Sequence, residues 1–156
     1  MKNPESDIEI LTRLGLYFSV RHTARTMRLF ADIFDYDYDC VIIFLSVGEV
    51  CFQAAFHLAP IEHGPAGIER IYSSITQSGL SVMTISEITG ISRETVRRKV
   101  KKLVDDKIFA LAPGGGKVYL PASVVTSDRF IDRFRTHLSE VGQFVRSVNF
   151  YERAND

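Results

Sequence analysis

Residues 81–120 combine helix-capping residues, short apolar repeats and glycines at spacings that few local structures satisfy. Ser81 precedes the first apolar repeat, and serine commonly accepts hydrogen bonds from the free amides at a helix start. The helix predicted there has an apolar face of three residues: Val82, Ile85 and Ile88. Gly90 is expected to end it, because glycine adopts a left-handed backbone at low cost. The spacing therefore predicts a short helix followed by a tight turn.

A second helix is predicted after Ser92, which is placed to cap it. Val96, Val100 and Leu103 recur at helical spacing and are expected to form its buried stripe. The opposite side carries mostly charged residues: Arg93, Glu94, Arg97, Arg98, Lys101 and Lys102. The pattern predicts a strongly amphipathic helix with a basic outer face.

A hairpin is predicted after this helix. The runs 109–111 and 118–120 resemble short strands, and the segment between them contains three consecutive glycines, Gly114–Gly116. Pro121 is expected to stop the second strand. The glycines lack the surrounding pattern of a nucleotide-binding loop, and no helix is predicted directly after them. We expect a β-hairpin with Lys117 near its tip.

The run Gly90-Ile91-Ser92-Arg93-Glu94-Thr95-Val96-Arg97-Arg98 resembles the turn and recognition helix of winged helix-turn-helix domains in bacterial transcription regulators. In layout the chain is most similar to the multiple-antibiotic-resistance repressor (MarR) type. The resemblance implies a mainly α fold with a small β-hairpin wing, a winged helix-turn-helix flanked by N- and C-terminal helices. It also implies that the flanking helices build a dimer. The specific motif covers about a quarter of the chain, and the N-terminal part departs from a typical member.

The second helix carries side chains suited to DNA. Arginine binds guanine through two hydrogen bonds, glutamate accepts from cytosine, and the threonine methyl contacts thymine. Lysines further along such a helix, and at a wing, suit phosphates. The expected DNA-binding residues are Ser92, Arg93, Glu94, Thr95, Arg97, Arg98, Lys101, Lys102 and Lys117. The alternative is an ordinary solvated helix face.

Charge is unevenly distributed, although the net charge is zero. Residues 1–64 hold five Lys/Arg and nine Asp/Glu, residues 65–120 hold nine and five, and residues 121–156 hold five of each. The excess of positive charge therefore coincides with the segment expected to meet phosphate.

Three more helices are expected ahead of residues 81–120, at 5–34, 38–58 and 66–77. The helix at 38–58 is apolar nearly all round, which predicts a central, buried position. Glu49, Gln53 and His57 form a polar line along it, either packed against another helix or partner subunit or forming the wall of an effector pocket. Because these polar residues interrupt its apolar run, we expect a helix of a soluble protein and not a membrane span.

The remaining chemistry-bearing residues suggest no catalytic or metal site. Cys40 and Cys51 would lie too far apart on one helix for a disulfide, which predicts reduced thiols, with a redox sensor as the alternative. His22, His63 and His137 have no ligand-like spacing. The polar, acidic start of the chain does not resemble a signal peptide. We therefore expect a cytoplasmic protein that is not an enzyme and uses no metal or cofactor.

The C-terminal segment carries an apolar seam at heptad-like spacing: Ile131, Phe134, Leu138, Val141, Val145 and Val148, widened by Phe130 and Phe144. We expect three regions: helical 1–64, the winged module 65–121, and a C-terminal helix 122–156. The seam predicts a homodimer, with packing inside one chain as the alternative. The function expected is sequence-specific binding of double-stranded DNA at a palindromic operator, with control by an unknown small-molecule effector as one option. The alternative is a winged module that binds protein.

Overall fold

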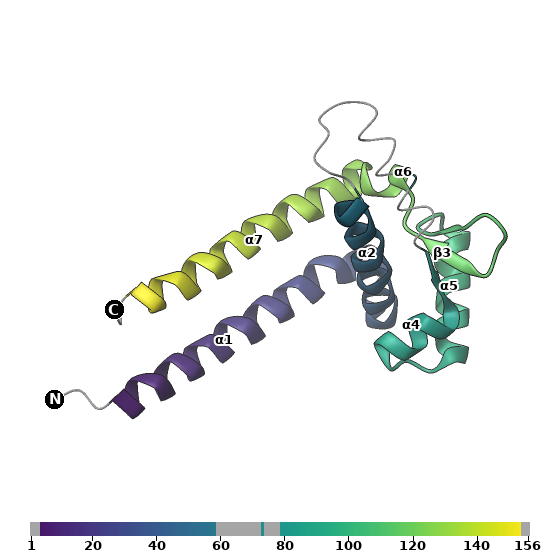
Figure 1. Cartoon of the computed structure of the whole chain (residues 1–156). Coiled ribbons are helices and arrows are strands. Elements are labelled where there is room, and N and C mark those ends of the chain that lie inside the picture. Colours follow the sequence, from purple (N-terminus) through teal and green to yellow (C-terminus); the bar gives the residue numbers. More distant parts are fainter. Residues whose placement is uncertain (1–3, 59–72, 74–78, 154–156) are drawn as a thin grey trace. The chain divides into compact units, whose positions relative to one another are not determined.

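The computed structural model describes residues 4–58, 73 and 79–153 and is mainly helical, with a small three-stranded antiparallel sheet (Figure 1). The elements are α1 (Pro4–Ala31), a 3-10 turn η1 (Asp32–Phe34), α2 (Tyr38–Leu58), β1 (Leu80–Ser81), α4 (Val82–Thr89), α5 (Arg93–Asp105), β2 (Ala110–Leu111), β3 (Lys117–Tyr119), α6 (Ala122–Val125) and α7 (Asp128–Arg153). Except for Ser73, the helix predicted at 66–77 lies outside the described residues, as do the boundary predicted at 64/65 and His63.

The chain forms two compact units. One comprises residues 1–36 and 131–156, and the other comprises residues 37–130. The sequence groups the helix at 38–58 with the N-terminal region, whereas in the structure α2 belongs to the unit that holds α4, α5 and the sheet. We describe each unit by itself.

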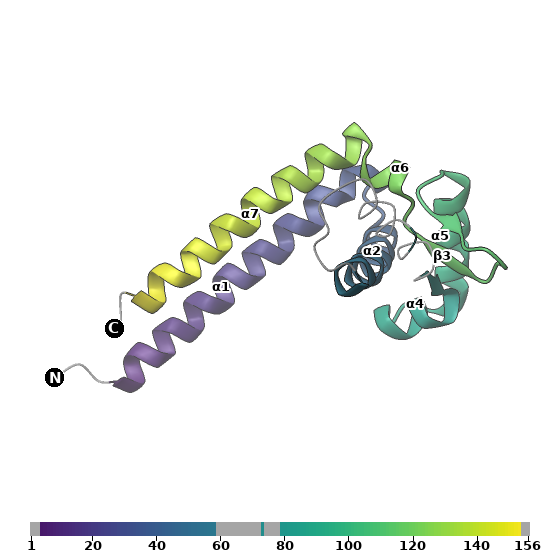
Figure 2. The same cartoon turned by 45° about the horizontal axis from the view of Figure 1, so that its top comes forward.

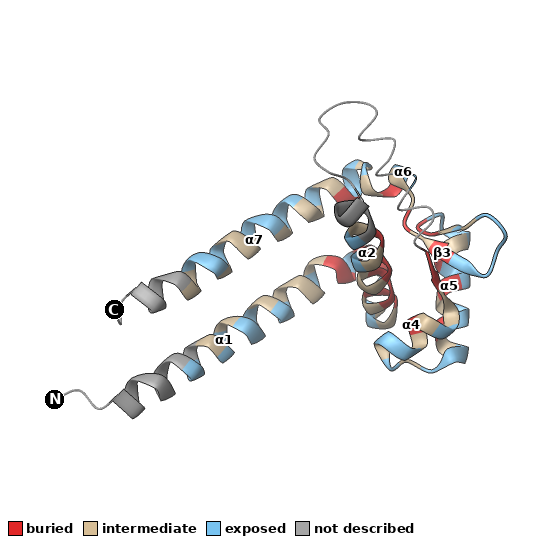
Figure 3. Cartoon of the chain, viewed as in Figure 1, coloured by how far each residue is buried: buried red, intermediate tan, exposed pale blue. Residues whose placement is uncertain are grey.

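Helix α2 forms the centre of the 37–130 unit, and the prediction of a buried apolar helix at 38–58 is confirmed. It packs against α4, α5 and β3, and Figure 3 colours many residues of α2 as buried. Phe44 stacks on Phe109, with ring centroids 6.5 Å apart, and contacts Phe130 at 5.2 Å. Asp37 caps the helix by accepting a hydrogen bond from the Cys40 amide at 3.3 Å.

The caps predicted for α4 and α5 are present. The Thr84 amide donates to the Ser81 hydroxyl at 3.1 Å, and the Thr95 amide donates to the Ser92 hydroxyl at 3.3 Å. Gly90 ends α4 in the left-handed conformation, with φ of 72°, and its amide donates to the Ser86 carbonyl. These local bonds fix a tight turn between two helices that pack on each other.

The apolar face predicted for α4 is wrong at one position. Ile85 is fully buried, whereas the side chain of Ile88 is 53% exposed. The physical reason is the rotation of about 100° per residue along a helix. Viewed down the helix axis, Val82 and Thr89 lie on one side of Ile85, and Ile88 lies on the other side. The buried face of α4 therefore includes Ile85 and the side of the helix that carries Val82 and Thr89, both of which are half-buried.

The sheet contains the predicted hairpin and one further strand. Strand β3 lies between β2 and β1, with Leu111 opposite Val118 and Leu80 opposite Val118 on the other side. The three glycines at the hairpin tip all have positive φ, from 74° to 89°, a conformation that glycine adopts at low cost. Strand β1 was not predicted. Gly79 comes directly before β1 in the chain and lies very close to β3. A Cβ added at Gly79 would lie 2.7 Å from the Val118 carbonyl oxygen.

In the other unit, α1 and α7 lie side by side and antiparallel in both views (Figures 1 and 2). Aromatic contacts join them: His22 stacks on Phe144 at 5.1 Å and on His137 at 5.7 Å, and Phe30 contacts Phe134 at 5.7 Å. Arg133 of α7 pairs with Asp32 of η1. Ring contacts and the Arg133–Asp32 ion pair therefore join α1 and η1 to α7.

Two members of the predicted C-terminal seam do not pack inside the chain. Leu138 and Val145 are 68% and 46% exposed, although Phe130 is buried and the other seam residues are half-buried. The contact with α1 is made by Phe134 and Phe144 of the seam, together with the neighbouring residues His137 and Glu140. Along the part of the chain that the structure describes, none of the helices has the combination of length and apolarity that crossing a bilayer requires.

The close approach at Gly79 generates a stability prediction. Gly79→Ala should lower the free energy of unfolding by about 1–3 kcal/mol, because the new methyl group forces β1 away from β3. Urea denaturation followed by circular dichroism measures it. Gly15→Ala is the matched control: it lies inside α1 with open space around it, so it should leave stability unchanged or raise it by about 0.5–1 kcal/mol. Equal effects of the two substitutions would contradict the packing described for β1.

Candidate nucleic-acid interface

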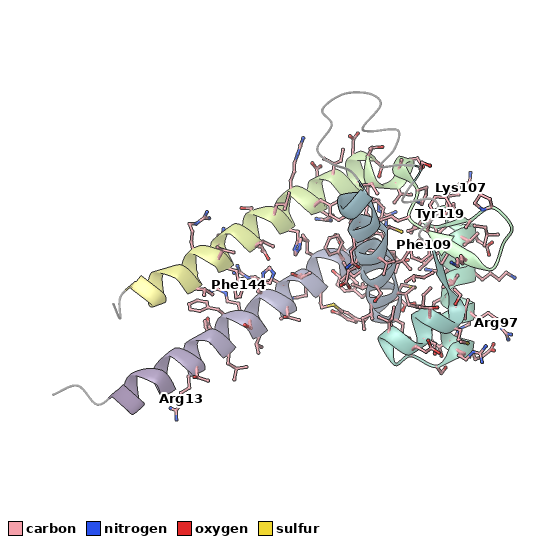
Figure 4. The ribbon with its side chains drawn as sticks, in the orientation of Figure 1. Arg13, Arg97, Lys107, Phe109, Tyr119 and Phe144 are labelled. Atoms are coloured by element: carbon pink, nitrogen blue, oxygen red, sulfur yellow. The ribbon has the colours of Figure 1, made fainter. Side chains whose placement is uncertain are left out.

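The outer face of α5 carries the basic residues that the sequence places there. Val96, Val100 and Leu103 are buried beneath the helix, whereas five cations on the other side are exposed: Arg93, Arg97, Arg98, Lys101 and Lys102. Figure 4 shows Arg97 on the side of α5 away from α2. The predicted amphipathic arrangement is confirmed, and it puts the cations on one solvent-facing surface.

Two of these cations form ion pairs within the helix. Arg97 contacts Glu94 at 2.5 Å, and Lys102 lies 3.7 Å from Asp106. All four side chains are largely exposed, so each pair contributes little to stability and breaks at small cost. The guanidinium and ammonium groups therefore remain available to an anionic partner.

Lys99 is the cation of α5 that differs from the rest. Its ammonium group forms an ion pair with Asp37, and the side chains of Lys99 and Asp37 are only 18% and 23% exposed. Asp37 thus caps α2 and holds α5 at once. Sequence reasoning missed this pair because its members lie 62 positions apart, and nothing local marks either residue.

The electrostatic surroundings of Asp37 favour its charged form. Partial burial by itself raises the pKa of this carboxyl group, but hydrogen bonds from Lys99 and from the Cys40 amide outweigh it and hold the pKa below the usual value of 3.8. The carboxylate is therefore ionised at neutral pH and contributes to the stability of the folded unit.

The remaining predicted DNA-binding residues are also accessible. Ser92 and Glu94 are exposed, and Thr95 is half-buried where its hydroxyl accepts a hydrogen bond from Ser92 at 2.9 Å. Lys117 is exposed at the start of β3, next to the glycine tip. The hairpin therefore presents a cation on a loop whose backbone is set by its glycines.

The predicted polar line on α2 lies partly outside the described side chains. Glu49 and Gln53 are exposed, and the side chain of His57 is not among those described. An effector pocket at these residues stays a prediction. A cavity that the sequence did not indicate lies between α1 and α7, lined in part by Phe18, His22 and Phe144.

Both cysteines are free and buried, as predicted. Burial, together with the negative charge of Asp37, raises the pKa of the Cys40 thiol to about 11, and burial raises the pKa of Cys51. Both thiols are therefore protonated at neutral pH, which argues against a reactive redox sensor. The structure brings His22 and His137 together, yet no group of three metal-ligating side chains occurs among the described residues.

Comparison with known proteins adds no relative: no family model, curated protein or solved structure matches the chain.

The Asp37–Lys99 pair generates a pH prediction. Because the folded-state pKa of Asp37 is lowered, its contribution is complete above about pH 4 and is lost as the pH falls further. Asp37→Asn should lower the free energy of unfolding by about 1–2 kcal/mol at pH 7 and reduce the further loss on acidification. Denaturation at pH 7 and pH 3 measures both effects.

The control is Asp106→Asn, which removes a longer, exposed ion pair on the same helix. It should change stability by less than about 0.5 kcal/mol. If Asp37→Asn were as mild as Asp106→Asn, the contact between α5 and the start of α2 would have no energetic weight.

Proposed function

We propose that the chain is a dimeric, sequence-specific DNA-binding transcription regulator of the winged helix-turn-helix class, with a MarR-like layout. The observation that supports this most is the capped, packed helix α5, which turns five cations outward while Val96, Val100 and Leu103 are buried. A rigid helix with a basic outer face has the shape and charge that the major groove admits. Two buried, protonated thiols fit a reducing cytoplasm.

The proposed division of labour follows the position of each side chain along α5. Arg93, Arg97 and Arg98 lie in its first half, where recognition helices reach base edges, with Glu94 and Thr95 between them. Lys101 and Lys102 lie one turn further on and suit phosphates. The ion pair between Arg97 and Glu94 is exposed enough to open when the arginine meets a base.

The hairpin supplies the wing of this proposal. Its tip follows from the positive φ values of Gly114–Gly116, and Lys117 provides a charge beside it. One such lysine fits a phosphate contact, which carries no sequence information by itself. We assign Lys117 to affinity and the α5 arginines to sequence.

The proposed dimer uses the apolar surface that the α1–α7 pair leaves exposed. Leu138 and Val145 lie on one flank of α7, and Glu140 and Gln143 lie on the other flank, at about 100° per residue. Leu16 lies on the corresponding flank of α1 and is as exposed as Leu138. Pairing these flanks across a two-fold axis would bury them and bring two recognition helices to a palindromic site.

One observation favours the alternative of a protein-binding module. Among the described residues of the unit that holds α5, four large apolar or aromatic side chains are exposed: Tyr38, Met83, Ile88 and Leu111. Exposed apolar surface commonly marks a protein interface. A module that binds only protein has little use for five outward cations on one helix, so DNA binding remains the better-supported function.

The proposal predicts the effect of two arginine substitutions. Arg97→Ala and Arg98→Ala should each weaken binding to the preferred DNA site by about 1–3 kcal/mol, because each removes a contact to base edges. Fluorescence anisotropy with a selected duplex and a scrambled duplex measures the loss. The fold should be retained, since both side chains point into solvent.

Two further variants make the test specific. Lys117→Ala should weaken both duplexes about equally and reduce the salt slope by about one unit. Arg135→Ala, an equally exposed cation on α7, should change neither affinity nor sequence preference. Unchanged DNA affinity in both the Arg97→Ala and Arg98→Ala variants would contradict sequence reading by α5. A chain that binds a protein partner and no DNA would favour the protein-binding module.

The proposed dimer predicts that charges on its apolar flank change the oligomeric state. Leu138→Glu with Val145→Glu should convert a full-length dimer into a monomer, because two charges replace apolar surface at the proposed contact. Light scattering with size-exclusion chromatography measures the mass. Operator binding should weaken together with dimerisation, since one helix and one wing make few contacts.

Met83→Glu is the control, because it places the same charge on an exposed apolar position of α4. It should leave the oligomeric state unchanged. A wild-type chain that is monomeric and still binds a single half-site with nanomolar affinity would refute the dimer.

A further inference from the structure

The space between α1 and α7 has a composition that neither DNA binding nor dimerisation explains. A cavity of about 60 Å³ lies there, and its lining includes Phe18, Arg21, His22, Arg25, Glu140 and Phe144. A wider hollow of about 760 Å³ shares Arg25 and Glu140 with this cavity and adds Arg28 and Arg133. We call the two together the α1–α7 trough.

The trough carries an excess of positive charge. Four guanidinium groups line it, against the carboxylates of Glu140 and Asp32. Arg21, Arg25 and Arg28 recur at spacings of four and three, so one side of α1 presents all three. This flank is opposite to that of Leu16, so the trough and the proposed dimer surface lie on different sides of the helix pair.

Most of these arginine donors are not consumed by acidic partners. Asp32 is paired with Arg133, but the nearest oxygen of Glu140 lies 4.0 Å from Arg25, beyond hydrogen-bond distance. Among the residues that the structure describes, Arg21 and Arg28 form no ion pair, and Arg28 donates to the Ala24 carbonyl only through Nε. Several guanidinium N–H groups that line the trough therefore have no acceptor among the described residues.

The geometry points to a binding site for a small multivalent oxyanion, a phosphate or a polycarboxylate, held by Arg21, Arg25 and Arg28. Guanidinium groups match carboxylate and phosphate oxygens through paired hydrogen bonds, and an anion with several oxygens engages more than one of them. The rings of His22 and Phe144 stack on each other and form an aromatic wall of the cavity beside the charged groups. An organic anion in the cavity therefore meets aromatic carbon beside the guanidinium groups.

Glu140 gives the site an internal test. Its Oε2 atom is buried and has no hydrogen-bond partner among the described residues, and its negative charge opposes an incoming anion. Removing that charge should strengthen anion binding, whereas removing arginine charge should weaken it. Opposite effects from residues on facing helices would place the anion between them.

Isothermal titration calorimetry of the full-length chain at constant ionic strength tests the site, with pyrophosphate, citrate and adenosine monophosphate as probes and acetate as the monovalent control. We expect saturable binding at one site per chain for at least one multivalent probe, and much weaker binding of acetate. Preference for pyrophosphate or citrate separates phosphate from carboxylate chemistry. Tighter binding of the nucleotide would indicate use of the aromatic wall.

Variants locate the site. Arg25→Gln with Arg28→Gln should weaken binding by about 10- to 100-fold. Glu140→Gln should strengthen it by about fivefold. Arg97→Gln with Arg98→Gln should leave it unchanged, because those residues lie on α5 in the other unit. Helical content by circular dichroism, checked for each variant, separates loss of the site from loss of the fold.

Two results would overturn the inference. One is the absence of saturable binding for all three multivalent probes. The other is binding that survives the Arg25/Arg28 substitutions but is lost in the Arg97/Arg98 variant, which would assign the anion to the basic face of α5. Neither result bears on whether α5 reads DNA, so the two proposals fail independently.

Discussion

The burial of three side chains of α5 determines what the rest of the 37–130 unit presents to solvent. Val96, Val100 and Leu103 fix the rotation of the helix about its own axis, and a fully buried side chain of this size contributes about 1.5–3 kcal/mol. The exposed ion pairs of the same helix contribute at most about 1 kcal/mol each. Packing, and not charge, therefore decides that the arginines face outward.

Asp37 adds a second constraint on the same helix. It caps α2 through the Cys40 amide and pairs with Lys99, so the start of the central helix and the middle of α5 are held by one carboxylate. The ion pair joins two specific groups and therefore resists sliding of α5 along α2. Apolar packing is non-directional and resists this sliding less. The basic face is thus fixed in rotation by the stripe and in position by the ion pair.

The sequence predicted those features whose causes are local. Four such features are confirmed: the caps at Ser81 and Ser92, the left-handed Gly90 and the apolar stripe of α5. Each depends on residues within one or two helical turns of each other. What was missed depends on distant residues. Strand β1 is two residues long and exists because β3 pairs with it, and Lys99 is distinguished from its basic neighbours by a carboxylate 62 positions away.

The contacts between α1 and α7 also depend on distant residues and could not be predicted from local sequence. The heptad-like spacing on α7 correctly marks an apolar flank, but periodicity does not say which neighbour covers it. His22 and His137 are 115 positions apart in the chain and stack in the structure, because α1 and α7 meet only after folding. The trough arginines are unremarkable in sequence for the same reason.

Selection of duplexes from a random pool by the full-length chain at physiological salt tests the central claim most directly, because it asks whether the basic face of α5 reads sequence at all. The account predicts enrichment of a two-fold symmetric site whose half-sites lie about 10–10.5 base pairs apart, or a multiple of this spacing. A pool that stays random through successive rounds, although the protein is folded and dimeric, would contradict it.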